Sequence, residues 1–284
     1  MADVPGFLSS NISFGLYTFP NGFKLVSADQ QTKLDELEIP FLDGAHAPPG
    51  YLSSKVIRLN GMLGGSGALD SNGNYIKNRD DLDAEINVMA QQIESGYQYL
   101  TVGISNRSRV ILAQKRKFIA TYMEGTRNTV TDIQIEFIAP DPRWLNSVPS
   151  IATFPANGGA ATLTSNGSAT SYPVFTIVGA ATNPYIQITP VGFAGVLKVQ
   201  PIVTLGSTDT LVINCDSRAR AQSIMLNGAY RLDLLGPSSL TNNAGTQDFF
   251  PLIRPGGNPA SVGADNAPSN NFNASVAWND AYLF

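Results

Sequence analysis

The sequence predicts a mixed α/β N-terminal half followed by an all-β C-terminal half. Two observations predict this order. The one clear helical pattern lies in the first half among strand patterns, and beyond residue 150 only short strand patterns separated by Gly, Pro, Asn and Ser remain. The length of 284 residues suits about two domains. We therefore expect an N-terminal domain over 1–144, a linker over 145–150 and a C-terminal β-sandwich over 151–284.

The first strands are predicted by alternation of apolar residues with polar or small ones. Ile12, Phe14 and Leu16 alternate in this way, and Phe23 and Leu25 do so after an Asn-Gly turn signal. Stronger still is the run 56–63, which leads into a glycine-rich segment over 64–67 that we expect to be a flexible hairpin tip.

A helix over 79–95 is predicted by one apolar stripe. The stripe consists of Leu82, Ile86, Met89 and Ile93, at spacings of 4, 3 and 4. The expected N-terminus has Asn78 as N-cap and the acidic residues Asp80, Asp81 and Asp83 near the start, and the expected C-terminal stop is Gly96. An amphipathic helix must bury its stripe, so we expect this helix to cover one face of a sheet.

Further strands are expected on both sides of the predicted domain boundary. In the first half they are Tyr97–Ile104, Ser108–Ala113, Arg116–Glu124 and Thr129–Ile138, the last of which ends at Pro140-Asp141-Pro142. In the second half they are Ala161–Thr164, Val174–Val178, Tyr185–Thr189, Leu197–Leu205, Thr210–Asn214, Ser223–Leu226, Tyr230–Leu234, Phe250–Ile253 and Ala274–Ala277. We expect residues 236–245 to form a long exposed loop.

The composition favours a protein that assembles with neighbours. Charged residues make up 14 % of the chain, against about 25 % in typical domains, so little desolvation opposes burial of its surface. The net charge of −4 excludes a strongly basic nucleic-acid binder. No run approaches the roughly 20 apolar residues of a membrane span, and the start lacks the pattern of a secretion signal, so we expect no membrane insertion and synthesis in the cytoplasm.

The residue census argues against catalysis and against a transition-metal site. His46 is the only histidine, it lies among prolines and glycines, and no Gly-x-Ser-x-Gly elbow is present. Cys215, the only cysteine, excludes a disulfide within the chain, and we expect it to be a small buried residue on a strand. A site of imidazoles and thiolates is excluded by number. We expect no catalytic, cofactor-binding or metal-binding residues.

Three weaker patterns have simpler structural explanations. Asp70–Asn74 places oxygen donors at alternate positions, with Asp81 at the twelfth place of a calcium loop, but Tyr75 stands where that loop needs Gly. Calcium binding there stays open beside an Asx-rich hairpin. Paired acids such as Asp80 and Asp81 are more often partners of a helix dipole than a glycosidase pair. The basic run 115–117 suggests a solvated strand face or a salt bridge between subunits.

The order of these segments resembles the bacteriophage distal tail protein family over nearly the whole chain. The segments that carry the resemblance are the strand 56–63, the glycine hairpin 64–67, the helix 79–95, the strand 97–104 and the Asp-Pro-aromatic junction 137–144. In the second half they are 172–177 with 183–186, the hairpin 209–214 with Arg218, Arg220 and 226–228, the turn 250–259 and the strand 274–278. His46 departs from the pattern, because 44–50 is a looser version of the glycine-and-histidine loop of some members.

The resemblance implies a fold, partners and a location. The N-terminal domain would be a split-barrel-like, ring-forming domain, and the C-terminal domain a galectin-like β-sandwich. Copies of the chain would form a ring, a hexamer, that joins the tail tube protein to the tail tip or hub protein in the virion, with DNA only passing through the lumen. Sheet edges and the hairpin 61–74 are the expected self-association surfaces.

Two other functions remain as alternatives. A carbohydrate-binding module at the host surface would use aromatic side chains of the sandwich, for which Tyr185, Phe193, Tyr230 and Trp278 are available. A cell-wall hydrolase lacks the residues that its chemistry would need.

Overall fold

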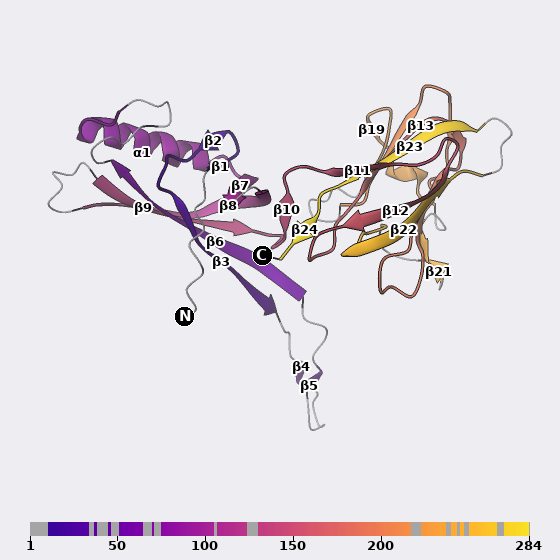
Figure 1. Cartoon of the computed structure of the whole chain (residues 1–284), viewed down its shortest axis with the longest axis horizontal. Coiled ribbons are helices and arrows are strands. Elements are labelled where there is room, and N and C mark those ends of the chain that lie inside the picture. Colours follow the sequence, from indigo (N-terminus) through magenta and orange to yellow (C-terminus); the bar gives the residue numbers. More distant parts are fainter. Residues whose placement is uncertain are drawn as a thin grey trace. The chain divides into compact units, whose positions relative to one another are not determined.

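The chain folds into two compact units, one ending at Ser147 and the other spanning Val148–Leu283 (Figure 1). The computed structural model describes residues 11–33, 37–38, 45–46, 51–64, 70, 75–104, 107–123, 130–216, 223–236, 240–242, 245–246, 250–265 and 270–283. Among these residues no helix has the length and apolarity that a membrane crossing requires.

The first unit is an open antiparallel sheet with a helix on one face. The sheet has the order β2-β1-β7-β8-β9-β6-β3, with β10 beside β8. Its strands are β1 (Ile12–Phe14), β2 (Tyr17–Thr18), β3 (Lys24–Lys33), β6 (Tyr51–Gly64), β7 (Gln98–Ile104), β8 (Arg107–Tyr122), β9 (Val130–Ala139) and β10 (Trp144–Asn146). A separate pair is formed by β4 (Leu37–Glu38) and β5 (Ala45–His46). The described strands do not close into a barrel, because β2 and β3 stay apart at the two ends.

The helix α1 (Arg79–Ile93) lies across one face of this sheet (Figure 1). All four residues of its predicted stripe are buried. The Asn78 Oδ1 atom accepts a hydrogen bond from the Asp81 backbone N–H at 2.9 Å, which confirms the predicted N-cap. Gly96 follows the helix with φ of +82°, a left-handed conformation that glycine adopts without strain.

The second unit is a β-sandwich, as predicted. One sheet has the order β11-β23-β13-β17-β18-β19, with β16 beside β13, and the other has the order β12-β22-β14-β15-β20-β21. The strands of the first are β11 (Ser150–Thr153), β13 (Val174–Thr182), β16 (Thr204–Leu205), β17 (Thr210–Asn214), β18 (Ser223–Leu226), β19 (Ala229–Tyr230) and β23 (Asn271–Trp278). Those of the second are β12 (Gly159–Ser165), β14 (Tyr185–Ile188), β15 (Leu197–Val199), β20 (Leu240–Asn242), β21 (Gly245–Thr246) and β22 (Gly256–Gly263).

The core of the sandwich is made by alternate residues of both sheets. Phe175 and Ile213 point inward from one sheet and Ile186 and Val262 from the other, all at most 2 % exposed. The remaining short elements are η1 (Leu232–Leu234), a 3₁₀ turn, and β24 (Ala281–Tyr282). Cys215 is fully buried in this core directly after β17, and burial raises the pKa of its thiol, as expected for a small apolar role.

Three boundaries in the first unit differ from prediction. Leu16 is fully exposed in the turn between β1 and β2, so the alternation ends at Phe14. The strands expected over 108–113 and 116–124 are one strand, β8, because a bulge between Lys115 and Lys117 absorbs the change of register. The expected linker over 145–150 is shorter, since Leu145 and Asn146 pair with β8 and Ser150 pairs with β23.

The second unit brings four more corrections. Pro201 interrupts the strand expected over 197–205, which becomes β15 and β16, and the strand expected over 230–234 is mostly the turn η1. Phe250–Ile253 is not a strand, although Ile253 makes an isolated bridge to Ser171. The strand is instead β22, within which Gly256 and Gly257 pair with β12. Part of the loop expected over 236–245 is strand β20, while 237–239 and 243–244 lie outside the described residues.

One buried hydroxyl lowers the stability of the first unit and leads to a prediction. The Thr131 Oγ1 atom is buried in β9 without a hydrogen-bond partner among the described residues. A buried hydroxyl without a partner costs about 1–3 kcal/mol. Thr131→Val, which keeps the β-branched shape, should therefore raise the unfolding free energy by about 1 kcal/mol in urea denaturation. A loss of stability would show that the hydroxyl has a partner.

Candidate functional site

The sheet of the first unit has an open face on the side away from α1. Side chains on this face come from alternate residues of each strand, and they are partly exposed, whereas the intervening residues are buried under the helix. On β6 the exposed set includes Arg58 and Met62, and on β9 it includes Gln134 and Glu136. The open face is thus the polar side of an amphipathic sheet.

An ion-pair ladder crosses three strands on this face. The Arg58 guanidinium on β6 lies 3.0 Å from Asp29 on β3 and 3.0 Å from Glu136 on β9. The hydrogen bond from Arg58 holds the pKa of Glu136 below its usual range, and the nearby Arg116 and Lys117 act in the same direction. Because Arg58 is about half exposed, the ladder adds little free energy. It joins side chains of three strands that backbone pairing already places side by side.

Among the residues that the structure describes, the two ends of this sheet are free edges. β3 at one end is ten residues long and pairs only with β6 among the described strands, with two breaks of register along the pairing. β2 at the other end is a two-residue strand whose one partner in the described part of the chain is β1. A free edge presents backbone N–H and C=O groups that can pair with a strand of another chain. The first unit therefore offers two different edges.

Exposed apolar side chains flank the β2 edge. Leu16 is fully exposed at the tip of the β1–β2 turn, and Tyr97 and Tyr99 are each about half exposed beside it. The turn and β7 are neighbours, because the Gly15 N–H donates to the Tyr99 carbonyl at 3.0 Å. A fully exposed leucine suits a surface that another molecule covers.

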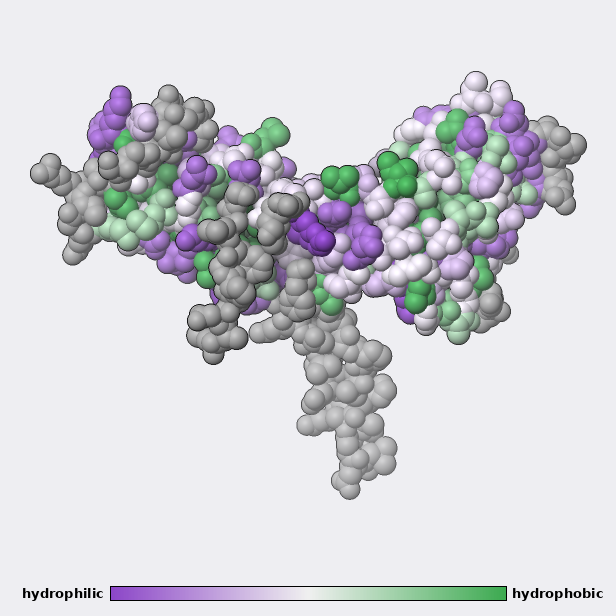
Figure 2. All heavy atoms as spheres, in the orientation of Figure 1, coloured by the Kyte–Doolittle hydropathy of each residue, from purple (hydrophilic) through white to green (hydrophobic). Residues whose placement is uncertain are grey.

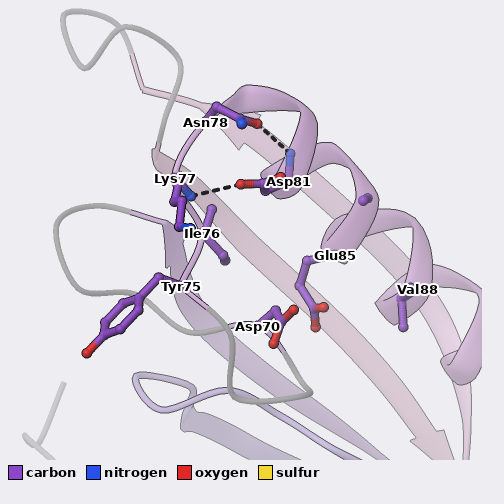
Figure 3. Close-up of a pocket in the computed structure, with 9 residues that line it drawn as sticks. Asp70, Tyr75, Ile76, Lys77, Asn78, Asp81, Glu85 and Val88 are labelled. Atoms are coloured by element: carbon purple, nitrogen blue, oxygen red, sulfur yellow. Dashed lines mark hydrogen bonds between the residues drawn. The ribbon is translucent and has the colours of Figure 1, made fainter.

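A pocket of about 480 Å³ lies beside the N-terminal half of α1 (Figure 3). Asp70 and Glu85 extend their carboxylates into it, with Ile76 and Val88 on its walls. Glu85 is buried and accepts a hydrogen bond from the Tyr17 hydroxyl at 2.9 Å. Burial, and then the charge of Glu85, raise the pKa of Tyr17. Glu85 is not singled out from the sequence, because one polar residue within a helix gives no signal that it is buried with Tyr17.

The acids near the pocket have structural partners. The Asp81 carboxylate accepts from the Lys77 backbone N–H at 3.0 Å, so Asp81 closes the helix start, as dipole partners do. Within the described residues no group of three or more His, Cys, Asp or Glu side chains could hold a metal ion. Residues 71–74 of the open calcium hypothesis lie outside the described residues, as do 65–69 of the hairpin.

A second buried group of charges, also missed from the sequence, lies where β9 ends. Lys55 on β6 is fully buried, with its Nζ atom 5.9 Å from the centre of the Trp144 ring. The Arg143 guanidinium forms two hydrogen bonds to Asp141, at 2.8 and 3.0 Å. Burial lowers the pKa of Lys55 to about 8, while the charge of Asp141 acts in the opposite direction. We call this group of Lys55, Asp141, Arg143 and Trp144 the ionic corner.

The other residues singled out from the sequence lie in different elements. His46 lies in β5 of the first unit, and Cys215 is fully buried in the core of the second unit. Lys115 forms an ion pair with Glu94 of the same chain, directly after α1. Arg218 and Arg220 lie outside the described residues.

The four aromatic residues of the carbohydrate-binding alternative do not form one platform. Trp278 is buried and donates to Asp280. Tyr185 lies on the outer face of one sheet, where Lys198 covers its ring at 4.8 Å and Gly263 leaves room for it. Tyr230 lies on the other sheet, and Arg254 stacks over Phe193 at 5.7 Å. Sugar stacking needs a free aromatic face, which Tyr185 and Trp278 do not offer.

Comparison with solved structures identifies the fold. A search of protein-family models gives no match, and a search of curated proteins gives none. The crystal structure of the SPP1 Dit protein, described as a paradigm of the hub adsorption apparatus in phages that infect Gram-positive bacteria, matches with a TM-score of 0.65 at 13 % identity, over 96 % of this chain and 99 % of that one.

The phage p2 baseplate in its activated conformation also matches, at 8 % identity in both cases. The structure with Sr gives a TM-score of 0.48 over 97 % and 99 % of the two chains, and the structure with Ca gives 0.45 over 93 % and 92 %. These lower scores add nothing to the fold assignment. The chain has the fold of the SPP1 Dit protein along nearly the whole length of both chains.

Proposed function

We propose that this chain is a structural component of a phage tail tip, whose copies close into a ring through the sheet edges of the first unit. The carrying observation is the open sheet with two different free edges, flanked at β2 by the fully exposed Leu16. A ring needs two unlike surfaces on each subunit, because a head-to-tail contact is heterologous. The shared fold with the SPP1 Dit protein supports the same role.

The proposal includes the partners of the ring and excludes turnover. The ring, a hexamer, would join the tail tube protein on one side to the tip or hub protein on the other, in the virion, and would let DNA pass without binding it. The weakly charged surface fits such burial. The second unit would be a galectin-like sandwich outside the ring. The chain would act by binding its neighbours without catalysing a reaction, because its single histidine and single cysteine are too few for the catalytic and metal sites considered above.

Ring formation is tested by imaging the purified chain and one edge variant. Negative-stain images of the wild-type chain should show closed rings with outer lobes. Leu16→Asp places a charge at the β2 edge and removes no contact within the chain, because Leu16 is fully exposed. It should raise the concentration of half-maximal assembly at least tenfold, or about 1.4 kcal/mol.

The matched control is Val148→Asp, which puts the same charge at another exposed apolar residue, 68 % accessible and outside the sheet. This variant should assemble like the wild type. A wild-type chain that stays monomeric at tens of micromolar, with no rings in the images, would show that the proposal is wrong.

A further inference from the structure

The outward face of the β11-β23-β13-β17-β18-β19 sheet carries no charge. None of these six strands, nor β16 beside them, contains Asp, Glu, Lys, Arg or His. On the side of the second unit that Figure 2 shows, pale residues of intermediate hydropathy are mixed with hydrophobic and hydrophilic ones. We define the neutral face by the outward residues of the six strands.

The registers of the strands place these residues in three rows. The middle row is Thr153, Ser275, Thr176, Val212, Met225 and Tyr230. The first is Ile151, Ala277, Val174, Asn214 and the buried Ser223, and the third is Asn273, Val178 and Thr210. Ile151 is 69 % exposed and Tyr230 is 75 % exposed, at opposite ends of the face. The face therefore mixes exposed apolar side chains with short hydroxyls and amides only.

The two other outward sheet surfaces differ from it. The open face of the first unit carries the Asp29–Arg58–Glu136 ladder. The opposite sheet of the sandwich carries Lys198, which covers the Tyr185 ring. Charges on a sheet that faces water oppose association with other sheets. The strands of the neutral face carry no such charges, so covering them with another surface would cost no desolvation of charged groups on these strands.

We propose that a second copy of this chain docks on the neutral face through its own neutral face. Two such faces would bury no charge, whereas a charged partner surface would lose hydration without gaining a counter-charge. Nor would the sandwiches repel strongly, because residues 151–284 hold 5 Lys and Arg against 6 Asp and Glu. Sheets that pack face to face align closely at about 10 Å, which suits short side chains such as Thr and Ser.

The size of the face is sufficient for a weak, specific dimer. Six strands about 4.8 Å apart, with three rows about 7 Å apart, give roughly 500 Å² per copy. The pair would bury about 1,000 Å², the lower limit for a specific interface. A contact of this size would be measurable at high concentration, and it uses a different surface from the ring edges, so it is independent of the proposed ring.

The test places one charge at the centre of the face. Val212→Lys should weaken dimerisation at least tenfold in sedimentation velocity at about 100 µM, measured in the Leu16→Asp background so that edge contacts contribute little. Thr162→Lys puts the same charge on exposed β12 of the opposite sheet and should leave the dimer unchanged. Thermal unfolding of each variant shows whether it has folded.

A cross-linking experiment tests the symmetry without adding charge. Thr176→Cys lies beside Val212 in the middle row. Because facing sheets are about 10 Å apart and a disulfide needs Cα atoms within about 7 Å, two docked copies should be joined by a bis-maleimide cross-linker of matching length. The natural Cys215 is fully buried and does not compete. Thr162→Cys should give no cross-linked pair. Monomers at 100 µM, equal weakening by both lysines, or equal cross-linking at both cysteines would overturn the proposal, whether or not rings form.

Discussion

Asn258→Ala should lower the unfolding free energy of the second unit by about 3–5 kcal/mol. Asn258 is fully buried, and its side chain replaces backbone pairing where the chain enters β22. Its Oδ1 atom accepts from the Val191 N–H at 3.2 Å and from the Arg254 N–H at 3.0 Å. Its amide donates to the carbonyls of Arg254 at 2.7 Å, Gly256 at 2.8 Å and Leu163 at 3.2 Å.

The magnitude follows from the number of groups left behind. Each buried backbone group that loses its partner costs about 1–3 kcal/mol, so a few such groups account for the expected loss. Asn273→Ala, an exposed asparagine on β23, serves as the matched control and should change stability by no more than about 0.5 kcal/mol. Denaturant unfolding followed by tryptophan fluorescence measures both. Equal small effects would show that the Asn258 bonds add little.

Asn258 also lies in a strand that local sequence patterns do not predict. The resemblance places a turn over 250–259, and no strand is predicted over 256–263, where Gly-Gly-Asn-Pro has low strand propensity. In the fold they form β22, since Asn258, Ala260 and Val262 alternate inward and the glycines pair with β12. Tertiary pairing overrides local propensity at this point. The helix α1 was predictable to within two residues because its cap, stripe and stop all agree.

The sequence predicts that sheet edges form the candidate interface, but it does not predict which edges they are. The small number of charges and the many alternating strand patterns indicate a β protein that buries polar surface in contacts with neighbours. An open sheet has two edges, so edge contacts are expected. Which edges stay free depends on pairing between distant strands, such as β6 with β9, and no local signal encodes that order. Leu16 illustrates the limit, because its alternation predicts an inward residue while Gly15 turns the chain and leaves it exposed.

The stability of the wild-type chain should rise by about 3 kcal/mol relative to Lys55→Met as the pH increases from 8 to 10.5. Burial lowers the pKa of Lys55 to about 8 in the folded chain, from an ordinary value of 10.5. Between these values the unfolded chain holds more protons than the folded chain, so raising the pH favours folding. Below pH 8 the wild type carries the full penalty of a buried charge.

Methionine suits this position because it keeps the length of the side chain beside Trp144 without the charge. Asp141 keeps its two bonds to Arg143 in the variant, so the carboxylate stays paired. At pH 7 we therefore expect Lys55→Met to be at least as stable as the wild type in urea. Tyr17, whose pKa is raised by burial, lowers stability above about pH 10 in both proteins and cancels in the difference.

The control for this pH series is Lys24→Met, which removes an exposed lysine at the start of β3. Its stability difference from the wild type should stay nearly constant over the same range. A flat difference for Lys55→Met would mean that Lys55 reaches water or a second carboxylate in the folded chain. A difference that falls with pH would mean that the folded chain holds the lysine proton more tightly than the unfolded chain, because the ionic corner would then stabilise the charge more than burial penalises it.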